Sequence, residues 1–283
     1  MARAIVFLSD FGLQDEFVGT CHAVVARLAP AARVIDLSHG VPPGDVLRGA
    51  LLLRGCLPFV PDDAVLLGVV DPGVGGSRTP LAVRTPAGIL LVGPDNGLLS
   101  LAWEALGGVA EAVRIDAPDV VFQPTSRTFH GRDVFAPAAA RLAEGGAPAS
   151  LGTPVPPASL VTLEAPTAEV DEGAVAATVL SVDRFGNVSL AATAGDLRAA
   201  GLDRARALEV RTRERVARAT PGSTFGDVEP GMLVVLVDSA GWAAIGRNGG
   251  SAADLLAASP GSVVRLRAVT NPAGQASPPS AGS

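Results

Sequence analysis

Two segments of the chain supply an acid, a guanidinium and an imidazole. Asp71 opens the stretch Asp-Pro-Gly-Val-Gly-Gly-Ser-Arg, which ends at Arg78, and His130 lies in Phe-His-Gly-Arg-Asp. Such a set can hold a nucleophile by charge-assisted hydrogen bonds and remove its proton. The glycine spacing fits neither the dinucleotide fingerprint nor the phosphate-binding loop, because no Lys-Ser/Thr ends it. A purely structural salt bridge between Asp71 and Arg78 is the alternative.

The motif Ser-Asp-Phe-Gly near the N-terminus adds two carboxylates, Asp10 and the nearby Asp15. Asp10 suits a ribose-diol acceptor, because one carboxylate can accept from both vicinal hydroxyls, with Asp15 facing an ammonium group. Alternatively, Asp15 only caps the helix expected from residue 16. Asn96, in Gly-Pro-Asp-Asn-Gly, either lines a ligand or only helps to form a turn.

The second half of the chain offers an acid, an aromatic ring and an amide in one short stretch, Asp183, Phe185 and Asn187. An amide can read the edge of adenine through a donor and an acceptor, and a phenyl ring can stack on its face. A hairpin turn at residues 185–187 is the structural alternative.

The first half of the chain alternates short apolar runs with helical patterns. Strands are expected at residues 4–8, 34–37, 64–70, 81–83 and 89–92, and helices at 16–28, 45–53 and 134–142. This alternation predicts an α/β domain with a mostly parallel sheet flanked by helices. The acidic and glycine-rich motifs follow the expected strands, and in such sheets ligands bind at the carboxyl ends of the strands.

The pattern changes after a proline-rich stretch. Beyond it we expect strands at residues 174–182, 207–210, 232–237 and 263–268, and a short helix at 252–258. Short strands separated by Gly, Asp and Pro turns indicate a smaller C-terminal β-barrel domain. The predicted domains are therefore an α/β domain at 1–152, a linker at 153–169, a barrel at 170–270 and a disordered tail at 271–283.

Composition excludes several classes of partner. The sequence has no apolar run of the roughly 18 residues that a membrane-spanning helix needs, so no membrane partner is expected. Its N-terminus does not have the order of a signal peptide, which predicts a cytoplasmic location. The net charge is −6, and the basic residues at 204–218 alternate with acids and apolar residues, so no nucleic-acid partner is expected.

Nothing in the spacing of cysteines and histidines indicates a metal site. Cys21 and Cys56 form no CxxC pair and are interpreted as packing thiols. His22 and His39 are interpreted as structural residues, whereas His130 differs from them by its charged neighbours. We therefore expect no metal ligand.

Taken together, these segments resemble the SAM hydroxide adenosyltransferase family, also called SAM hydrolases, which is related to the fluorinase and chlorinase enzymes. The resemblance extends to about Arg267 and rests on five motifs in order, at residues 7–12 with Asp15, 71–78, 93–99, 129–133 and 183–187.

The resemblance implies attack of hydroxide on C5′ of S-adenosyl-L-methionine (SAM), which gives adenosine and L-methionine. SAM is the substrate, and no cofactor is implied. The family forms homotrimers with active sites between the N-terminal domain of one subunit and the C-terminal domain of the next. By the same matching, the catalytic residues are Asp71, Arg78 and His130. Substrate-binding residues are expected at Asp10, Asp15, Asp183, Phe185, Asn187, Phe225 and Ser239, with Asn96 as a possible lining residue.

Three positions depart from the fluorinase pattern. Ala240 stands where the fluorinase has an arginine on the methionine carboxylate, so Ser239, backbone amides or Arg247 must bind that group. Asp71 replaces the halide-pocket tyrosine and Gly131 the pocket serine. A carboxylate would repel a halide, so these changes favour the hydrolase over a halide-dependent adenosyltransferase. A non-catalytic SAM-binding module is the third reading, and it would not need the Asp-Arg-His set.

The chemistry suits these residue types. Methionine leaves a sulfonium as a neutral thioether, so no general acid is required, and the proton transfer concerns only the nucleophile. We expect His130 to take the proton, Asp71 or a neighbour to orient its ring, and Arg78 to hold the hydroxide.

Overall fold

The computed structural model describes residues 2–269 and divides the chain into two compact units between Ala165 and Pro166. This division falls within the predicted linker, and the predicted tail at 271–283 lies outside the described residues. None of the helices in the described range is long and apolar enough to cross a membrane.

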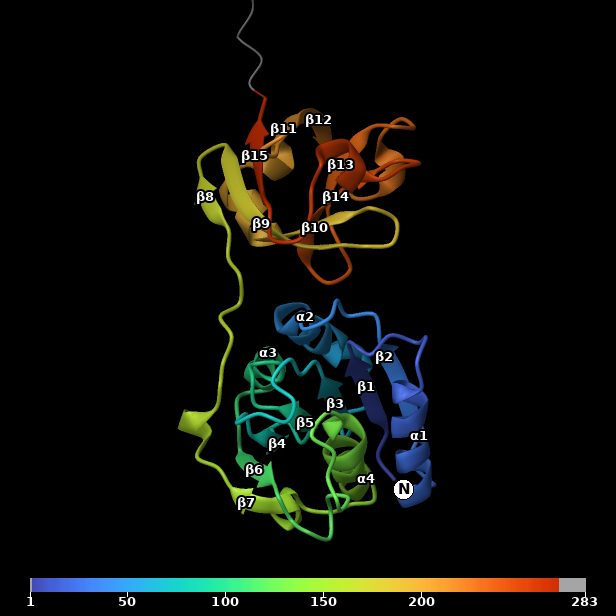
Figure 1. Ribbon diagram of the computed structural model, residues 1–283. Coiled ribbons are helices and arrows are strands. Elements are labelled where there is room, and N and C mark those ends of the chain that lie inside the picture. The colour runs from blue at the N-terminus through green and yellow to red at the C-terminus, as the bar shows by residue number, and fades with distance from the viewer. Residues whose placement is uncertain (1, 270–283) are drawn as a thin grey trace, which may run out of the picture. The chain divides into compact units, whose positions relative to one another are not determined.

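The first unit is a sheet between two layers of helices (Figure 1). Its strands are β1 (Ile5–Ser9), β2 (Val34–Ser38), β3 (Val65–Val69), β4 (Pro80–Arg84), β5 (Leu90–Pro94), β6 (Glu111–Ile115) and β7 (Gly152–Pro154). Its main helices are α1 (Phe17–Leu28), α2 (Val46–Cys56), α3 (Ser100–Ala105) and α4 (Ala136–Ala143). The expected strands and helices are all present with shifted bounds, and α3, β6 and β7 are additional.

Burial on both faces explains why β1 is apolar without interruption. Ile5 and Phe7 pack into a core with α1 and α4, whereas Val6 and Leu8 pack into a second core on the opposite face with α2 and α3. Such strands lose the alternation of polar and apolar residues that marks a half-exposed strand. Cys21 and Cys56 are buried free thiols, and burial raises their pKa to about 12 and about 11, respectively.

The strand order is β2-β1-β3-β5-β4-β6-β7. Pairing is parallel from β2 to β5 and antiparallel from β5 to β7, so the parallel part of the mixed sheet is the part that carries the motifs. The neighbours β1, β3 and β5 end just before Asp10, Asp71 and Asn96, respectively. Their parallel pairing therefore brings these three side chains to one edge of the sheet, as the sequence predicted.

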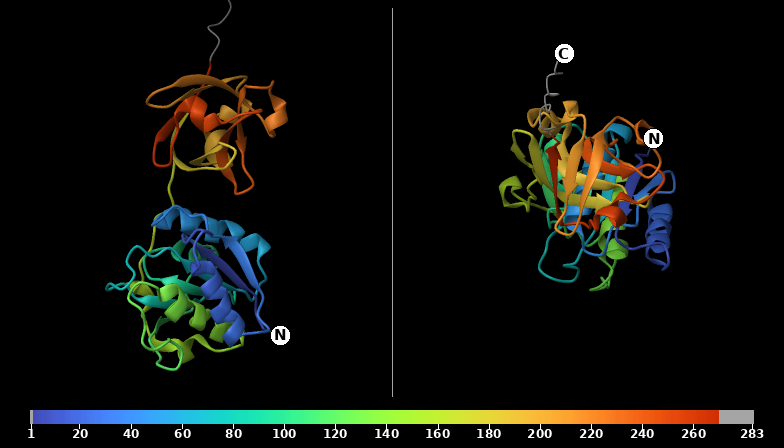
Figure 2. Two further views of the ribbon diagram at one scale, coloured as in Figure 1. Left: turned by 45° about the vertical axis from the view of Figure 1, so that its right-hand side comes forward. Right: turned by 90° about the horizontal axis from the view of Figure 1, so that it is seen from above.

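The second unit is a closed seven-stranded barrel with β8 (Glu169–Asp171) paired outside it (Figures 1 and 2). Its strands are β9 (Ala174–Val182), β10 (Val188–Thr193), β11 (Leu208–Arg211), β12 (Val216–Pro221), β13 (Leu233–Val237), β14 (Trp242–Arg247) and β15 (Val263–Ala268). Two short helices, α5 (Ala194–Ala199) and α6 (Ala252–Leu256), complete it. The ladder between β9 and β10 closes the ring, and full closure removes exposed sheet edges.

Candidate active site

Asp71 and Arg78 form a buried ion pair across the glycine-rich turn. Arg78 Nε donates to Asp71 Oδ1 at 2.9 Å and to Oδ2 at 3.0 Å, and Nη2 makes a further short contact with Oδ2. The two side chains are only 9% and 6% exposed, and the guanidinium lies over the ring of Phe135. This paired geometry fixes the plane of the guanidinium.

The same guanidinium reaches His130. Arg78 Nη2 lies 2.7 Å from His130 Nδ1. Because arginine has no acceptor, Nδ1 must be unprotonated and accept this bond, so the proton of the neutral ring is on Nε2. Arg78 therefore lies between the acid and the imidazole. Of the two expectations for what orients the histidine ring, Asp71 or a neighbour, the structure shows a neighbour, Arg78, in contact with Nδ1, and Asp71 reaches the ring only through Arg78.

The surroundings of His130 favour its neutral form. Burial and the charge of Arg78 lower the pKa of His130 below its ordinary value, against smaller opposing effects of Asp71, Asp133 and the Ser126 backbone. Protonation would place a second positive charge next to the guanidinium. The ring is thus available as an acceptor at Nδ1 whenever Arg78 releases it.

Asp133 holds the segment that carries His130. Its buried carboxylate accepts from Arg132 Nε at 2.6 Å and from the Ser126 backbone N–H at 2.8 Å. Burial raises the pKa of this carboxyl, but the hydrogen bonds from Arg132 and Ser126 outweigh that effect and lower it overall. The motif at 129–133 contained Asp133, yet its spacing gave no sign of this role, and nothing in the sequence singled out Ser126.

Two glycines allow close packing around these segments. An added Cβ on Gly75, whose φ is +73°, would lie 2.2 Å from the carbonyl oxygen of Arg127. An added Cβ on Gly131 would lie 2.9 Å from the ring of Phe11, which packs edge-on against Phe129. The turn at 71–78 and the segment at 126–131 are therefore in direct contact.

Asp10 faces a neighbouring loop. Its Oδ2 accepts from the Gly44 backbone N–H at 2.8 Å, and Gly44 in turn lies beside Pro72. Asp15 is exposed and is not the helix cap, because α1 has Glu16 at its N-cap without a side-chain capping bond. The capping interpretation of Asp15 is therefore wrong, and within residues 2–269 no hydrogen bond or ion pair engages its side chain.

Asn96 connects two strand ends. Its Nδ2 donates to the Val70 carbonyl at 2.9 Å, and its Oδ1 accepts from the Leu98 N–H at 3.1 Å. Val70 precedes Asp71, so Asn96 fixes the end of β3 where the acid begins its turn. The left-handed conformation of this turn is adopted by Gly97, at φ +92°, and not by Asn96.

Three of the expected site residues in the barrel unit, Asp183, Phe185 and Asn187, lie in the turn between β9 and β10. Asp183 Oδ1 accepts from the N–H groups of Phe185 and Asn187, and Oδ2 accepts from Asn187 Nδ2 at 2.7 Å. The hairpin interpretation is thus correct for the backbone. Nδ2 uses one of its two hydrogens in this bond, and Oδ1 is the acceptor that the Asn187 side chain can offer to a ligand.

An apolar surface borders that oxygen. An added Cβ on Gly246 would lie 2.4 Å from the Phe225 ring and 3.2 Å from Asn187 Oδ1, so the absence of a side chain lets these groups meet. Phe225 is 46% exposed and Phe185 is 77% exposed. Two exposed phenyl rings and one acceptor oxygen suit an aromatic base with an amino group.

Ser239 is exposed in the turn between β13 and β14. Asp238 Oδ1 holds this turn by accepting from the Ala240 N–H at 2.9 Å, and Oδ2 accepts from Ser189 Oγ. Arg247, an alternative group for a carboxylate, donates from Nε to the Gly231 carbonyl at 3.0 Å. The expected residues therefore form two groups, with Asp10, Asp15, Asp71, Arg78, Asn96 and His130 in the first unit and the others in the second.

Comparisons with known proteins show which protein family these two groups of residues belong to. The SAM hydroxide adenosyltransferase N-terminal domain matches residues 5–152, and the C-terminal domain of the same family matches residues 177–265. The chain belongs to the SAM hydroxide adenosyltransferase family. The buried Asp71–Arg78–His130 arrangement is thus a feature of a member of this family.

Two relatives named (R)-S-adenosyl-L-methionine hydrolase are similar over nearly their full length. The protein of Salinispora arenicola is 52% identical, with 93% of this chain and 97% of the relative covered. The protein of Thermus thermophilus is 41% identical, with 93% and 99% covered. A fluorinase of Actinopolyspora mzabensis is 27% identical, with 88% and 92% covered.

A solved structure has the same fold as this chain. The crystal structure of an uncharacterized conserved protein from Thermotoga maritima superimposes with a TM-score of 0.87 at 35% identity, covering 93% of this chain and 99% of the other.

Proposed function

We propose that this protein hydrolyses (R)-S-adenosyl-L-methionine to adenosine and L-methionine. The observation that carries the proposal is the buried Asp71–Arg78–His130 arrangement in a chain 52% identical to a protein named for this activity. Water supplies the oxygen and loses one proton, the C5′–sulfur bond breaks, and its electron pair leaves with the neutral thioether. The departing group needs no proton, so the residues have only to prepare the nucleophile.

In this proposal Arg78 holds the attacking water. Its bonds to Asp71 and His130 use the Nε and Nη2 donors, and no described residue takes the Nη1 donors. The water binds at Nη1, and as Nη2 turns toward the developing hydroxide it leaves His130 Nδ1 free to accept the proton. Asp71 stays paired with Arg78 through the Nε donor while Nη2 turns. Attack on a sulfonium neutralises charge, so a dry site favours the transition state over the charged reactants.

The remaining residues bind the substrate. Asp10 accepts from the ribose hydroxyls, and Asn187 Oδ1 accepts from the adenine amino group between Phe185 and Phe225. We assign Asp15 and Asp183 to the methionine ammonium group and Ser239 to its carboxylate. Asn96 acts by positioning Asp71, because its amide is engaged with Val70 and Leu98. The reaction itself needs neither cofactor nor metal.

We further propose that the protein is a homotrimer whose sites combine residues of two subunits. This is supported by the distribution of the substrate-binding residues over two compact units of one chain. Light scattering on the active protein should give three times the mass of one chain, and full activity at the mass of a single chain would exclude the trimer.

We also propose a cytoplasmic location. SAM carries a permanent sulfonium charge and does not cross the hydrocarbon core of a membrane unaided, which supports placing the enzyme in the compartment in which SAM is made. Cell fractionation tests this location.

Chromatography of a reaction mixture tests the activity. Purified protein with (R)-SAM should give equal amounts of adenosine and methionine, and the (S) epimer at sulfur serves as the matched comparison. In ¹⁸O-water the label should be on the 5′ oxygen of adenosine, and added chloride or fluoride should not divert the product. A 5′-halo-5′-deoxyadenosine product would reassign the chain to the halide-dependent enzymes, and binding without turnover would make it a SAM-binding module.

A further inference from the structure

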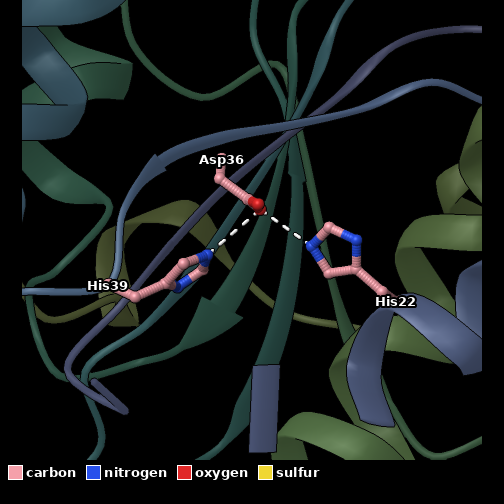
Figure 3. Close-up of side chains that lie close together, drawn as sticks. All are labelled: His22, Asp36 and His39. Carbon is pink, nitrogen blue, oxygen red and sulfur yellow. Dashed lines mark hydrogen bonds and ion pairs between the residues drawn. The ribbon is translucent and has the colours of Figure 1, made fainter. Parts of the chain in front are cut away.

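We propose that His22, Asp36 and His39 form a binding site for a divalent transition-metal ion such as Zn²⁺. The imidazole Nε2 atoms of both histidines face the same oxygen, Asp36 Oδ1, at 2.8 Å for His22 and 3.0 Å for His39 (Figure 3). All three ligand atoms lie within 4.8 Å of one another. Two imidazoles and a carboxylate are a common ligand set for Zn²⁺.

The three ligands come from elements that hold them firmly. His22 lies on α1, Asp36 on β2 and His39 directly after β2. The His39 ring packs edge-on against Phe7, with ring centroids 4.7 Å apart. Small side-chain rotations suffice to place an ion between the ligands, because two ligands of a tetrahedral ion at about 2.1 Å are about 3.4 Å apart.

His39 Nε2 is the observation that a salt bridge alone does not explain. This atom is buried and, among the described residues, has no partner that meets hydrogen-bond geometry, although Asp36 Oδ1 is 3.0 Å away. A buried polar atom without a partner needs an explanation, and an ion is one of the few available.

The other nitrogen of His39 has the partner that a metal ligand requires. Nδ1 lies 2.7 Å from the hydroxyl of Ser9, and both residues are buried. A histidine that binds a metal through Nε2 keeps its proton on Nδ1 and donates it to a nearby acceptor. The Ser9 oxygen can accept that bond together with its bond from the Phe11 N–H, since a hydroxyl has two lone pairs.

The outer side of the cluster gives an ion access to solvent. The side chains of His22 and Asp36 are 35% and 44% exposed, whereas that of His39 is 2% exposed. Solvent can therefore supply the remaining ligands of a bound ion.

The cluster adjoins the loop of Asp10 without containing any of the residues assigned to catalysis. The His39 carbonyl accepts from the Gly12 N–H at 2.8 Å, and Ser9 directly precedes Asp10. A bound ion would therefore connect α1 and β2 to this loop and stabilise the first unit. Its role is structural.

The test is metal binding by the untagged full-length protein after treatment with a chelator. Titration with Zn²⁺ in a calorimeter should show one ion per chain. His22→Gln and Asp36→Asn should each weaken binding at least tenfold, because each removes one ligand at a partly exposed position. His130→Gln is the matched control, since it removes the third histidine of the chain and should leave Zn²⁺ affinity unchanged.

Two further readouts do not depend on activity. Zn²⁺ should raise the Tm of the wild-type protein and of His130→Gln, but not that of His22→Gln or Asp36→Asn. Co²⁺ should give visible absorption bands that these two variants lack. The proposal is overturned if the wild-type protein binds no Zn²⁺, if either ligand variant changes affinity less than tenfold, or if His130→Gln loses the ion.

Discussion

Arg78 Nη2 donates to His130 Nδ1 across 2.7 Å, and this bond determines what the histidine can do. With Nδ1 occupied and the proton on Nε2, the neutral ring has no free lone pair. It becomes a base only when the guanidinium turns away. Arginine and histidine therefore act in sequence, and each of the proposed roles can be tested separately.

Arg78→Lys should lower kcat by roughly 10²–10³-fold, the usual cost of removing one donor that stabilises developing negative charge. A single ammonium group cannot pair with both Asp71 oxygens and also reach His130. The KM for SAM should change little, because the guanidinium acts on the nucleophile. Steady-state kinetics provides the test. A rise in KM by the same factor of roughly 10²–10³, with kcat unchanged, would assign Arg78 to substrate binding.

His130→Ala and His130→Gln should both lower kcat by roughly 10²–10⁴-fold, the span of general acid–base catalysis. The two variants distinguish a role of His130 as proton acceptor from a role as hydrogen-bond partner of Arg78. A glutamine oxygen can accept a hydrogen bond from Arg78 but cannot take the proton from water. Recovery of most activity in His130→Gln alone would show that the histidine only orients the arginine.

The lowered pKa of His130 predicts the pH dependence of the reaction. The neutral ring persists below its ordinary pKa of 6.5, so kcat should stay level from pH 8 to about 6.5 and fall only at lower pH. Because the pKa of His130 is lower in the folded protein than in the unfolded chain, the unfolded chain binds a proton at a higher pH. His130 therefore lowers the stability of the folded state as the pH falls below about 6.5. A kinetic pKa at or above 6.5 would contradict this order.

Asp10→Ala should weaken binding of both SAM and adenosine by roughly ten- to a hundredfold, which corresponds to a charged hydrogen bond of about 1.5–3 kcal/mol. Asp15→Ala is the matched control, because it should weaken SAM binding without affecting adenosine, which has no ammonium group. Calorimetry with adenosine distinguishes them, and unchanged affinity in Asp10→Ala would refute the ribose assignment.

Gly131→Ser should destabilise the protein by about 1–3 kcal/mol, as overpacking does in a close-packed site. The new Cβ would lie 2.9 Å from the Phe11 ring, which must move. Gly19→Ala is the control, because nothing lies within 4 Å of that position on α1, and it should raise stability by about 0.5–1 kcal/mol. Denaturant unfolding measures the stability of both variants. If Gly131→Ser is as stable as the wild type, the Phe11 ring can move aside without a loss in the free energy of unfolding.

The sequence predicted those features that depend on local pattern. Continuous apolar runs indicated β1 and β3, and the acids that follow them indicated the edge of the sheet where Asp10 and Asp71 lie. The alanine-rich β10 and β14, the latter with Gly246, were missed because alanine and glycine have low strand propensity.

Contacts between distant residues could not be predicted. The position of Arg78 between Asp71 and His130, the bond from Ser126 to Asp133 and the convergence of His22 and His39 on Asp36 all depend on tertiary packing. No spacing in the chain encodes these contacts.

The contact between Gly75 and the Arg127 carbonyl sets a limit on engineering. A loop transplanted from a relative into residues 71–78 will fit only if its residue at the Gly75 position is also glycine, or if residues 126–131 are exchanged with it. A donor loop without that glycine should therefore be moved together with residues 126–131, and a chimaera that exchanges such a loop alone is expected to lose the alignment of Arg78 with His130.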